Sequence, residues 1–424
     1  MKRYSEYKDS GAKWIGDIPK HWEVKKLRNL ISMTSVKNHP NETLLSVVRE
    51  QGVIVRDIEA DDNHNFIPED LSGYKLIEEG QFVINKMKAW QGSYAVSGYR
   101  GIVSPAHYTC DLRLAYKTFF NIAIRSCAYV PFFTQYSKGI RVGQWDLSPV
   151  GLKEIPFFLP PLAEQHAIVS YLDSKVGQID TEVAKQTQQI ELLKELKQAV
   201  IANAVTKGID NKAKLKQTGI SWIGHVPQHW ERCRCKDVLT EIKLLVGNGE
   251  YALLSLTTNG VIVRDLSEGK GKFPKDFNAY KVVKPNDLVF CLFDVDETPR
   301  TVGLVHNHGM LTGAYNVFET KNVDTSFLYH YFIALDNRKA LRPLYKGLRK
   351  VIPLPAFMSM PLYLPPLSEQ RAIVSYIEAQ TANIDKLIDA YEQQVERVKE
   401  YKQRLISDAV TGKINVTGKQ TQTN

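Results

Sequence analysis

The sequence predicts an α+β protein with two globular domains and two long helices, built by tandem duplication of one unit. The segment WIGDIPKHWE at residues 14–23 returns as WIGHVPQHWE at residues 222–231, with seven of ten positions identical. The segment LPPLAEQHAIVSYLD at residues 159–173 returns as LPPLSEQRAIVSYIE at residues 364–378, with eleven of fifteen identical. A period near 205 residues is far longer than that of solenoid repeats, so each unit is expected to be domain-sized.

The composition is that of a soluble globular chain. Its 424 residues are 43% hydrophobic and 24% charged, enough to bury several cores. No apolar run is long enough to span a bilayer, and the opening segment lacks the apolar stretch of a secretion signal. Five cysteines, an odd and unevenly placed set, suit a reducing compartment better than a disulfide framework. We therefore expect a cytoplasmic protein with no membrane partner.

The first part of each unit, residues 1–158 and residues 211–363, is expected to form a compact α+β domain. Short β-rich runs such as GVIVRDI and GQFVINKM in the first copy, and GVIVRDL and NDLVFCLF in the second, alternate with glycine, proline and asparagine turn signals. GVIVRD itself recurs at residues 52–57 and 260–265, and KGIR at residues 138–141 returns as KGLR at residues 346–349.

The second part of each unit, residues 159–210 and residues 364–415, is expected to form one long helix, leaving residues 416–424 as a polar tail. A proline pair precedes each helix, and Glu164 and Glu369 lie in the first turns, where the helix dipole favours acids. Apolar residues then recur at steps of three and four, as in a coiled coil. The first set is Ile168, Leu172, Val176, Ile179, Val183, Ile190, Leu193, Leu196 and Val200; the second is Ile373, Ile377, Ile384, Ile388, Tyr391, Val395, Val398 and Leu405.

These two helices are expected to pair as an antiparallel coiled coil that separates the two domains. A helix of some 43 residues spans about 65 Å, longer than a small domain. If the two copies are related by a pseudo-two-fold axis, their helices must run antiparallel. The alternative is that each amphipathic helix packs only on its own domain.

The positive charge belongs to the globular parts. The whole chain carries a formal net charge of +9, but residues 162–205 and residues 367–410 each carry a net charge of −2, which leaves +13 elsewhere. A positive excess on two domains favours a polyanionic partner that presents phosphates.

Motifs for nucleotide or metal chemistry are weak. The sequence has no GxxxxGK[ST] phosphate loop and no GxGxxG between a strand and a helix. The run HNH at residues 306–308 has no counterpart in the first copy, and neither has DVDE at residues 294–297. His225, His229, Cys233 and Cys235 resemble a zinc set, but the first copy has Asp17, His21, Lys25 and Leu27 at these positions, so the shared fold does not require a metal.

The duplicated WIGxxPxHWE and LPPLxEQxAIVSY segments resemble those of the specificity (S) subunits of type I restriction-modification enzymes, along nearly the whole chain. The resemblance implies two target-recognition domains, each reading one half of a gapped double-stranded DNA sequence. It also implies that the helices dock two methyltransferase (M) subunits, and that restriction (R) subunits join this core. S-adenosylmethionine, ATP and magnesium then belong to the partners, and this chain is a non-catalytic subunit that binds no cofactor.

Candidate DNA-binding residues can be sorted by the kind of contact they would make. Phosphate contacts position a protein on DNA, whereas base contacts specify the sequence. The repeated KGxR motif is expected to contact the DNA backbone in both copies, and the divergent residues are expected to read bases. The DNA-binding set is Lys86, Lys88, Gln91, Arg100, Lys138 and Arg141 in the first copy, and Arg300, His306, Asn307, Lys346, Arg349 and Lys350 in the second. The expected partner-docking set is Leu162, Glu164, Gln165, Ile168, Leu367, Glu369, Gln370 and Ile373.

Two other classes of function remain open on the residues alone. One is a nuclease with an unrecognised site, against which stands the lack of paired acids beside a lysine in both copies. The other is a coiled-coil adaptor that binds only protein, against which stands the positive excess on the domains.

Overall fold

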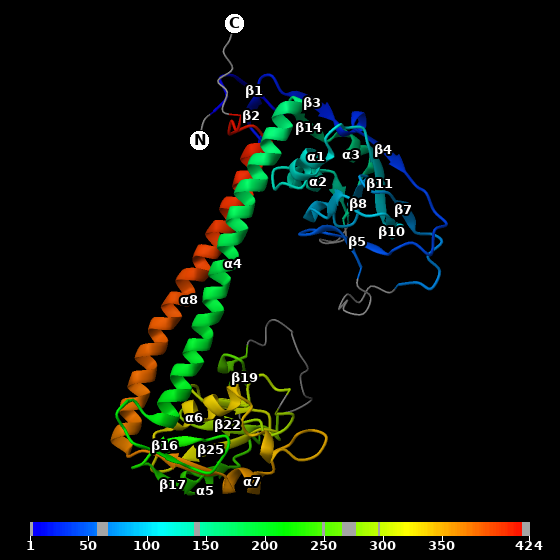
Figure 1. Cartoon of the computed structure of the whole chain (residues 1–424). Helices are drawn as coiled ribbons and strands as arrows, with labels where there is room; N and C mark the ends of the chain where they lie inside the picture. The colour runs from blue at the N-terminus through cyan, green and yellow to red at the C-terminus, as the bar shows by residue number, and fades with distance from the viewer. Residues whose placement is uncertain are drawn as a thin grey trace. The chain divides into compact units, whose positions relative to one another are not determined.

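The computed structural model (Figure 1) describes residues 3–56, 67–139, 145–247, 251–264, 277–295 and 297–417. The chain divides into two compact units. Unit 1 consists of Met1–Gln186 and Gln393–Asn424, and unit 2 of Thr187–Glu392. Because the divisions fall within the two long helices, each unit contains a half of each helix. The boundaries expected near residues 158 and 363 mark the places where these helices begin.

Unit 1 is built on a four-stranded antiparallel sheet in the order β4-β11-β8-β9. Its strands are β4 (Ile31–Thr34), β11 (His107–Leu112), β8 (Phe82–Asn85) and β9 (Tyr94–Val96). The side chains of Phe82, Val83 and Ile84 are fully buried. Phe82 and Ile84 contribute to the main core of the unit, and Val83 contributes to a second cluster with Leu45. This central strand is therefore covered on both faces, as its continuous apolar run indicates.

Unit 1 also contains shorter elements. Two-stranded sheets pair β1 (Tyr7–Asp9) with β2 (Asp17–Pro19), β3 (Glu23–Lys26) with β14 (Pro156–Leu159), β5 (Leu45–Val48) with β6 (Gly52–Val55), β7 (Lys75–Ile77) with β10 (Gly101–Val103), and β12 (Ser137–Lys138) with β13 (Asp146–Leu147). Its helices are η1 (Leu27–Asn29), η2 (Ala89–Gln91), α1 (Lys117–Ile124), α2 (Val130–Gln135) and α3 (Pro149–Glu154). The β3–β14 pair joins the strand after the first WIGxxPxHWE segment to the strand before the first long helix.

Unit 2 repeats this plan, with a sheet in the order β18-β25-β22-β23. The strands are β18 (Leu239–Ile242), β25 (Asn316–Thr320), β22 (Leu288–Phe290) and β23 (Val302–Leu304). The paired strands are β15 (Leu215–Gln217) with β16 (His225–Pro227), β17 (Glu231–Arg234) with β26 (Pro361–Leu364), β19 (Leu254–Thr257) with β20 (Gly260–Val263), and β21 (Lys281–Val283) with β24 (Gly309–Leu311). The helices are α5 (Cys235–Val238), α6 (Thr325–Asn337), η3 (Arg342–Leu344) and α7 (Leu354–Ser359). The α+β class and the internal repeat are confirmed.

The two long helices are α4 (Leu162–Lys207) and α8 (Leu367–Val410). In unit 2 they run antiparallel, since Lys197 contacts Asp385 while Val205, further along α4, shares a core with Ile373, nearer the start of α8. Of the apolar residues expected in the paired seam, Leu196 is an exception with 50% of its surface exposed. A straight helix turns by 3.6 residues rather than 3.5, so a seam predicted over many turns drifts off the contact.

No helix among the residues that the structure describes is long and apolar enough to cross a membrane.

Candidate nucleic-acid and partner interfaces

The repeated WIGxxPxHWE and LPPLxEQ segments meet in a carboxylate clasp, which we define as Glu164 with Trp22 and His21 in unit 1. The Trp22 indole Nε1 donates to Glu164 Oε1 at 3.1 Å, and His21 Nε2 lies 2.8 Å from Glu164 Oε2. The Tyr4 hydroxyl donates to the same carboxylate oxygen as Trp22. Burial and the neighbouring Glu164 carboxylate raise the pKa of Tyr4, so its hydroxyl stays a donor. The clasp fixes the N-terminal segment to the first turn of α4.

Unit 2 contains the same clasp at Glu369, with Trp230 and His229. The Trp230 indole donates to Glu369 Oε1 at 3.1 Å, and His229 Nε2 lies 2.7 Å from Glu369 Oε2. The neighbouring glutamines are equivalent too, because Gln165 and Gln370 each donate to the proline carbonyl five residues earlier at 2.8 Å. The repeated sequence therefore encodes a repeated anchor, in which Trp22 and Trp230 are structural.

Two ion pairs link the long helices, one in each unit. Lys402 Nζ lies 2.6 Å from Asp180 Oδ1 in unit 1, and Lys197 Nζ lies 2.6 Å from Asp385 Oδ1 in unit 2. Asp180 and Lys197 occupy the same repeat positions in α4 as Asp385 and Lys402 occupy in α8, 205 residues later. The two pairs are thus one contact made twice, which the periodicity of apolar residues did not reveal.

The expected docking residues are mostly inside the fold. Glu164, Gln165, Ile168, Gln370 and Ile373 are buried within their own units. Glu369 is partly exposed. Leu162 and Leu367, 49% and 40% exposed, are the members of the set that present apolar surface. These five buried residues can affect the binding of a partner only indirectly, by fixing where α4 and α8 begin.

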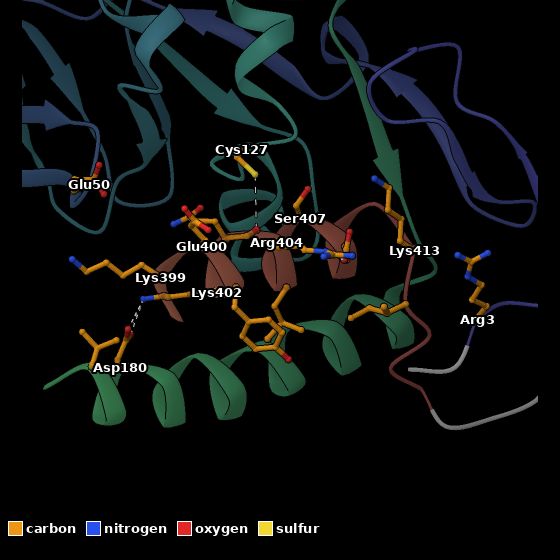
Figure 2. Close-up of a pocket in the computed structure, with 16 residues that line it drawn as sticks. Arg3, Glu50, Cys127, Asp180, Lys399, Glu400, Lys402, Arg404, Ser407 and Lys413 are labelled. Atoms are coloured by element: carbon orange, nitrogen blue, oxygen red, sulfur yellow. Dashed lines mark hydrogen bonds and ion pairs between the residues drawn. The ribbon is translucent and has the colours of Figure 1, made fainter. Parts of the chain in front are cut away.

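A groove of about 1240 Å³ opens beside the C-terminal half of α8 in unit 1 (Figure 2). The Asp180–Lys402 ion pair lies at one end of the drawn residues, and the Cys127 thiol points at the α8 backbone, 3.9 Å from the Gln403 carbonyl. The charged residues of the lining are Arg3, Lys399, Lys402, Arg404 and Lys413 with Glu50, Asp180, Glu400 and Asp408. This mixture of signs fits a protein surface better than a phosphate backbone.

In unit 1, Lys86 and Lys138 both lie beside Asp146, whereas Arg100 pairs with other acids. Lys86 pairs with Asp146 at 2.9 Å, and Arg100 pairs with both Glu42 and Glu78. These hydrogen bonds raise the pKa of Lys86 and of Arg100. Lys138 is exposed on β12, and Arg141 lies outside the described residues.

Lys88 immediately precedes η2 and Gln91 is its last residue, but the two side chains line different pockets. Lys88 lines a pocket of about 460 Å³ together with Arg56, Tyr74, Asn85 and His107. Burial lowers the pKa of His107 to about 4, so its imidazole is neutral near pH 7. Its Nδ1 lies 3.1 Å from the Ser104 carbonyl, which leaves Nε2 as an acceptor. Sequence reasoning singled out Lys88 but missed the other residues of this pocket, because they come from separated strands.

In unit 2, three of the expected residues lie together in one turn. Lys346, Arg349 and Lys350 belong to the segment 346–351, which we call the Leu348 turn. His306 and Asn307 are exposed in the connection between β23 and β24. Arg300 instead donates to Asn337 Oδ1 at 2.8 Å and lies 3.4 Å from Asp336, a buried carboxylate.

A metal site is not visible among the described residues, where no group of three histidine, cysteine or acidic side chains comes together. His229, one of the residues that resemble a zinc set, belongs to the clasp, and Cys235 is buried. Burial raises the pKa of Cys235, which disfavours the thiolate that zinc requires.

Comparison with known proteins identifies relatives of the whole chain. The family described as type I restriction modification DNA specificity domain matches residues 302–397. The chain is 25% identical to the type I restriction enzyme MjaVIII specificity subunit of Methanocaldococcus jannaschii, over 81% of this chain and 83% of that protein. It is 24% identical to the putative type I restriction enzyme MjaX specificity subunit of the same organism, over 95% and 96%. A chain solved in work on complex assembly and conformational transition of the type I R-M system has the same fold, with a TM-score of 0.66 at 15% identity, over 94% of this chain and 99% of that chain.

Proposed function

We propose that the chain is a specificity subunit of a type I restriction-modification system, like the relatives that it resembles. Each unit reads one half of a two-part DNA target, while the long helices dock methyltransferase subunits. Restriction subunits join this assembly, in the cytoplasm. S-adenosylmethionine, ATP and magnesium are bound by the partners, and the chain itself is non-catalytic.

The observation that carries this proposal is the contrast between an invariant frame and divergent surfaces. The clasps at Glu164 and Glu369 and the two helix ion pairs recur residue for residue. Residues 337–353 of unit 2 contain six lysines and arginines and no acid, whereas the equivalent residues 129–145 of unit 1 contain two basic residues. Two domains that share a frame but differ in their basic surfaces suit recognition of two different DNA sequences. Base contacts supply the sequence specificity, whereas phosphate contacts only position the protein on the duplex.

Docking of partners is supported by the surface of the helices. Leu162 and Leu367 are exposed at equivalent positions, and Leu196 and Tyr401, another equivalent pair, are 50% and 48% exposed. Each of these exposed apolar positions occurs once in each copy of the repeat, which fits two copies of one partner.

The test is to express the chain with a type I methyltransferase subunit in a host and to map methylated bases across its genome. We expect one motif made of two short specified parts and an unspecified gap. Replacing residues 24–158 with the matching region of another family member is expected to change one part and leave the other. A continuous motif, or a change in both parts, contradicts independent reading by the two units.

A gel shift of the purified chain on random duplex DNA at low salt distinguishes the proposed function from that of an adaptor that binds only protein. Binding that weakens steeply with added salt is expected from the basic domains. A chain that assembles with methyltransferase subunits but shifts no DNA contradicts the proposal.

A further inference from the structure

The Leu348 turn presents a leucine side chain to solvent in full. Leu348 is 102% exposed, and the next most exposed large apolar residue among those described is Val150 at 72%. Its neighbours Lys346 and Arg349 are exposed as well. Single exposed leucines are common on proteins and need no explanation by themselves. This one differs in how firmly the backbone presents it.

The turn is closed by hydrogen bonds at its base. The Lys346 and Val351 amides donate to each other's carbonyls at 2.8 and 3.0 Å, and the Lys350 amide donates to the Gly347 carbonyl at 3.1 Å. Gly347 has a φ of +69° and Lys350 a φ of +45°. Leu348 and Arg349 are therefore the two central residues of a tight turn.

The turn is also fixed to the segment that follows β22. The Asp294 amide donates to the Arg349 carbonyl at 2.9 Å, and the Ile352 amide donates to the Leu292 carbonyl at 2.8 Å. The Arg349 guanidinium makes a bidentate contact with Asp294, at 2.7 and 3.3 Å. The backbone that carries Leu348 is thus tied down on both sides, and its side chain is the part that projects.

The segment around the leucine carries more basic than acidic residues. Residues 337–353 carry six lysines and arginines without an acid. Of these six, Arg349 is paired with Asp294 at 2.7 Å, Lys350 with Glu297 at 3.3 Å, and Lys339 with Asp336 at 2.8 Å. A positive surface attracts the phosphates of a duplex and brings the turn against a groove.

We infer that Leu348 is a wedge that enters the DNA read by unit 2 and unstacks one base step, with the flanking lysines and arginines on the adjoining phosphates. The inference rests on the proposed function. The apolar environment that DNA offers to such a side chain is the stack of bases, and leucine is among the residues that proteins insert there. A flexible tip would bend aside, but a turn fixed at its base transmits the strain to the duplex.

The role also explains why Arg349 pairs with Asp294. An arginine that fixes the turn contributes to presentation of Leu348, so its replacement is expected to weaken DNA binding even where it touches no phosphate. The expectation from sequence that Arg349 contacts the DNA backbone stays a prediction.

The experiment uses the full chain assembled with its methyltransferase subunits on a duplex that carries the target mapped as above. 2-Aminopurine, which pairs with thymine, replaces one adenine at a time on either strand of the half-site read by unit 2 and its flanks, leaving out any adenine that the complex methylates. We expect the fluorescence of the probe to rise several-fold at one step on binding. Leu348→Ala is expected to abolish that rise and to weaken binding about ten-fold, as loss of a buried leucine side chain implies. Leu348→Met is expected to retain both.

Leu244→Ala is the matched control, because Leu244 is also an exposed leucine of unit 2, at 59%. It is expected to change neither fluorescence nor affinity. A wild-type complex that binds its target with no rise at any step overturns the inference, as does a Leu348→Ala complex that keeps the rise and the affinity. A Leu348→Ala chain that fails to assemble with its partners assigns the leucine to a protein interface and overturns it too. A wild-type complex that binds no DNA contradicts the proposed function instead.

Discussion

Removing the two clasp carboxylates separately is expected to destabilise the two units unequally. Glu164 has 9% of its side chain exposed, and it accepts from three groups, Trp22, His21 and Tyr4. The Trp22 indole is fully buried and Tyr4 is 9% exposed. Glu164→Ala therefore leaves two buried donors without a partner, and each costs about 1–2 kcal/mol. The expected loss in the free energy of unfolding of unit 1 is about 3 kcal/mol.

The equivalent change in unit 2 is milder. Glu369 has 26% of its side chain exposed, and His229, one of its two partners, is 51% exposed and can turn to water. Only the Trp230 indole, at 1% exposure, loses a partner that water does not replace. Because exposed ion pairs are screened, Glu369→Ala is expected to lower the free energy of unfolding of unit 2 by about 1 kcal/mol.

Native-state hydrogen exchange measures the two units separately, on amides of the central strands β8 and β22. Glu164→Ala is expected to speed exchange in β8 about 150-fold, and Glu369→Ala to speed exchange in β22 about five-fold. Tyr4→Phe serves as the intermediate case, because the second copy has Lys212 at that position and so lacks this donor. Equal effects in the two units, or a change in β8 below five-fold, refute the reasoning from buried donors.

Three further outcomes are expected. A double-mutant cycle on Asp180 and Lys402, read by urea unfolding, is expected to give a coupling of about 0.5 kcal/mol, since both side chains are partly exposed; a coupling above about 2 kcal/mol contradicts this. Burial lowers the pKa of His107 to about 4, so the folded unit favours the neutral imidazole. Acidification from the ordinary histidine pKa near 6.5 to pH 4 is therefore expected to lower the free energy of unfolding of unit 1 by up to about 3 kcal/mol. His107→Gln should remove that part of the pH dependence in thermal melts. Gly412→Ala is expected to lower the melting temperature of unit 1, because φ is +73° and a Cβ would lie 2.2 Å from Pro19 Cδ; an unchanged melting temperature would show that the end of α8 can move away.

Most of the architecture could be predicted from the sequence, because the long helices follow a periodic apolar pattern and the two units share repeated segments. The helices were expected within residues 159–210 and 364–415 and lie at Leu162–Lys207 and Leu367–Val410. The repeat gave the two α+β units. A pattern along the chain specifies which residues face a core, and the duplicated segments specify that the same core is built twice.

The surfaces were harder to predict, since they depend on pairs that are distant in the chain. Arg100 was expected to be available for DNA, but it meets Glu42 and Glu78, which the fold brings to it. Glu164 was expected on a docking surface, yet it is buried under Tyr4, which precedes it by 160 residues. Such contacts have no signature in local spacing.

The division of the long helices between the units has a consequence for the order of synthesis. Unit 2 is one continuous stretch, Thr187–Glu392, whereas unit 1 needs Gln393–Asn424 to be complete. Leu405, Ala409 and Val410 lie in the same core as Trp22 and Ile168. The domain that leaves the ribosome first must therefore wait, with part of its apolar surface uncovered, until the second has been made. Unit 2 is the one that can finish folding first, and the N-terminal unit is the one most exposed to damage by a late stop codon.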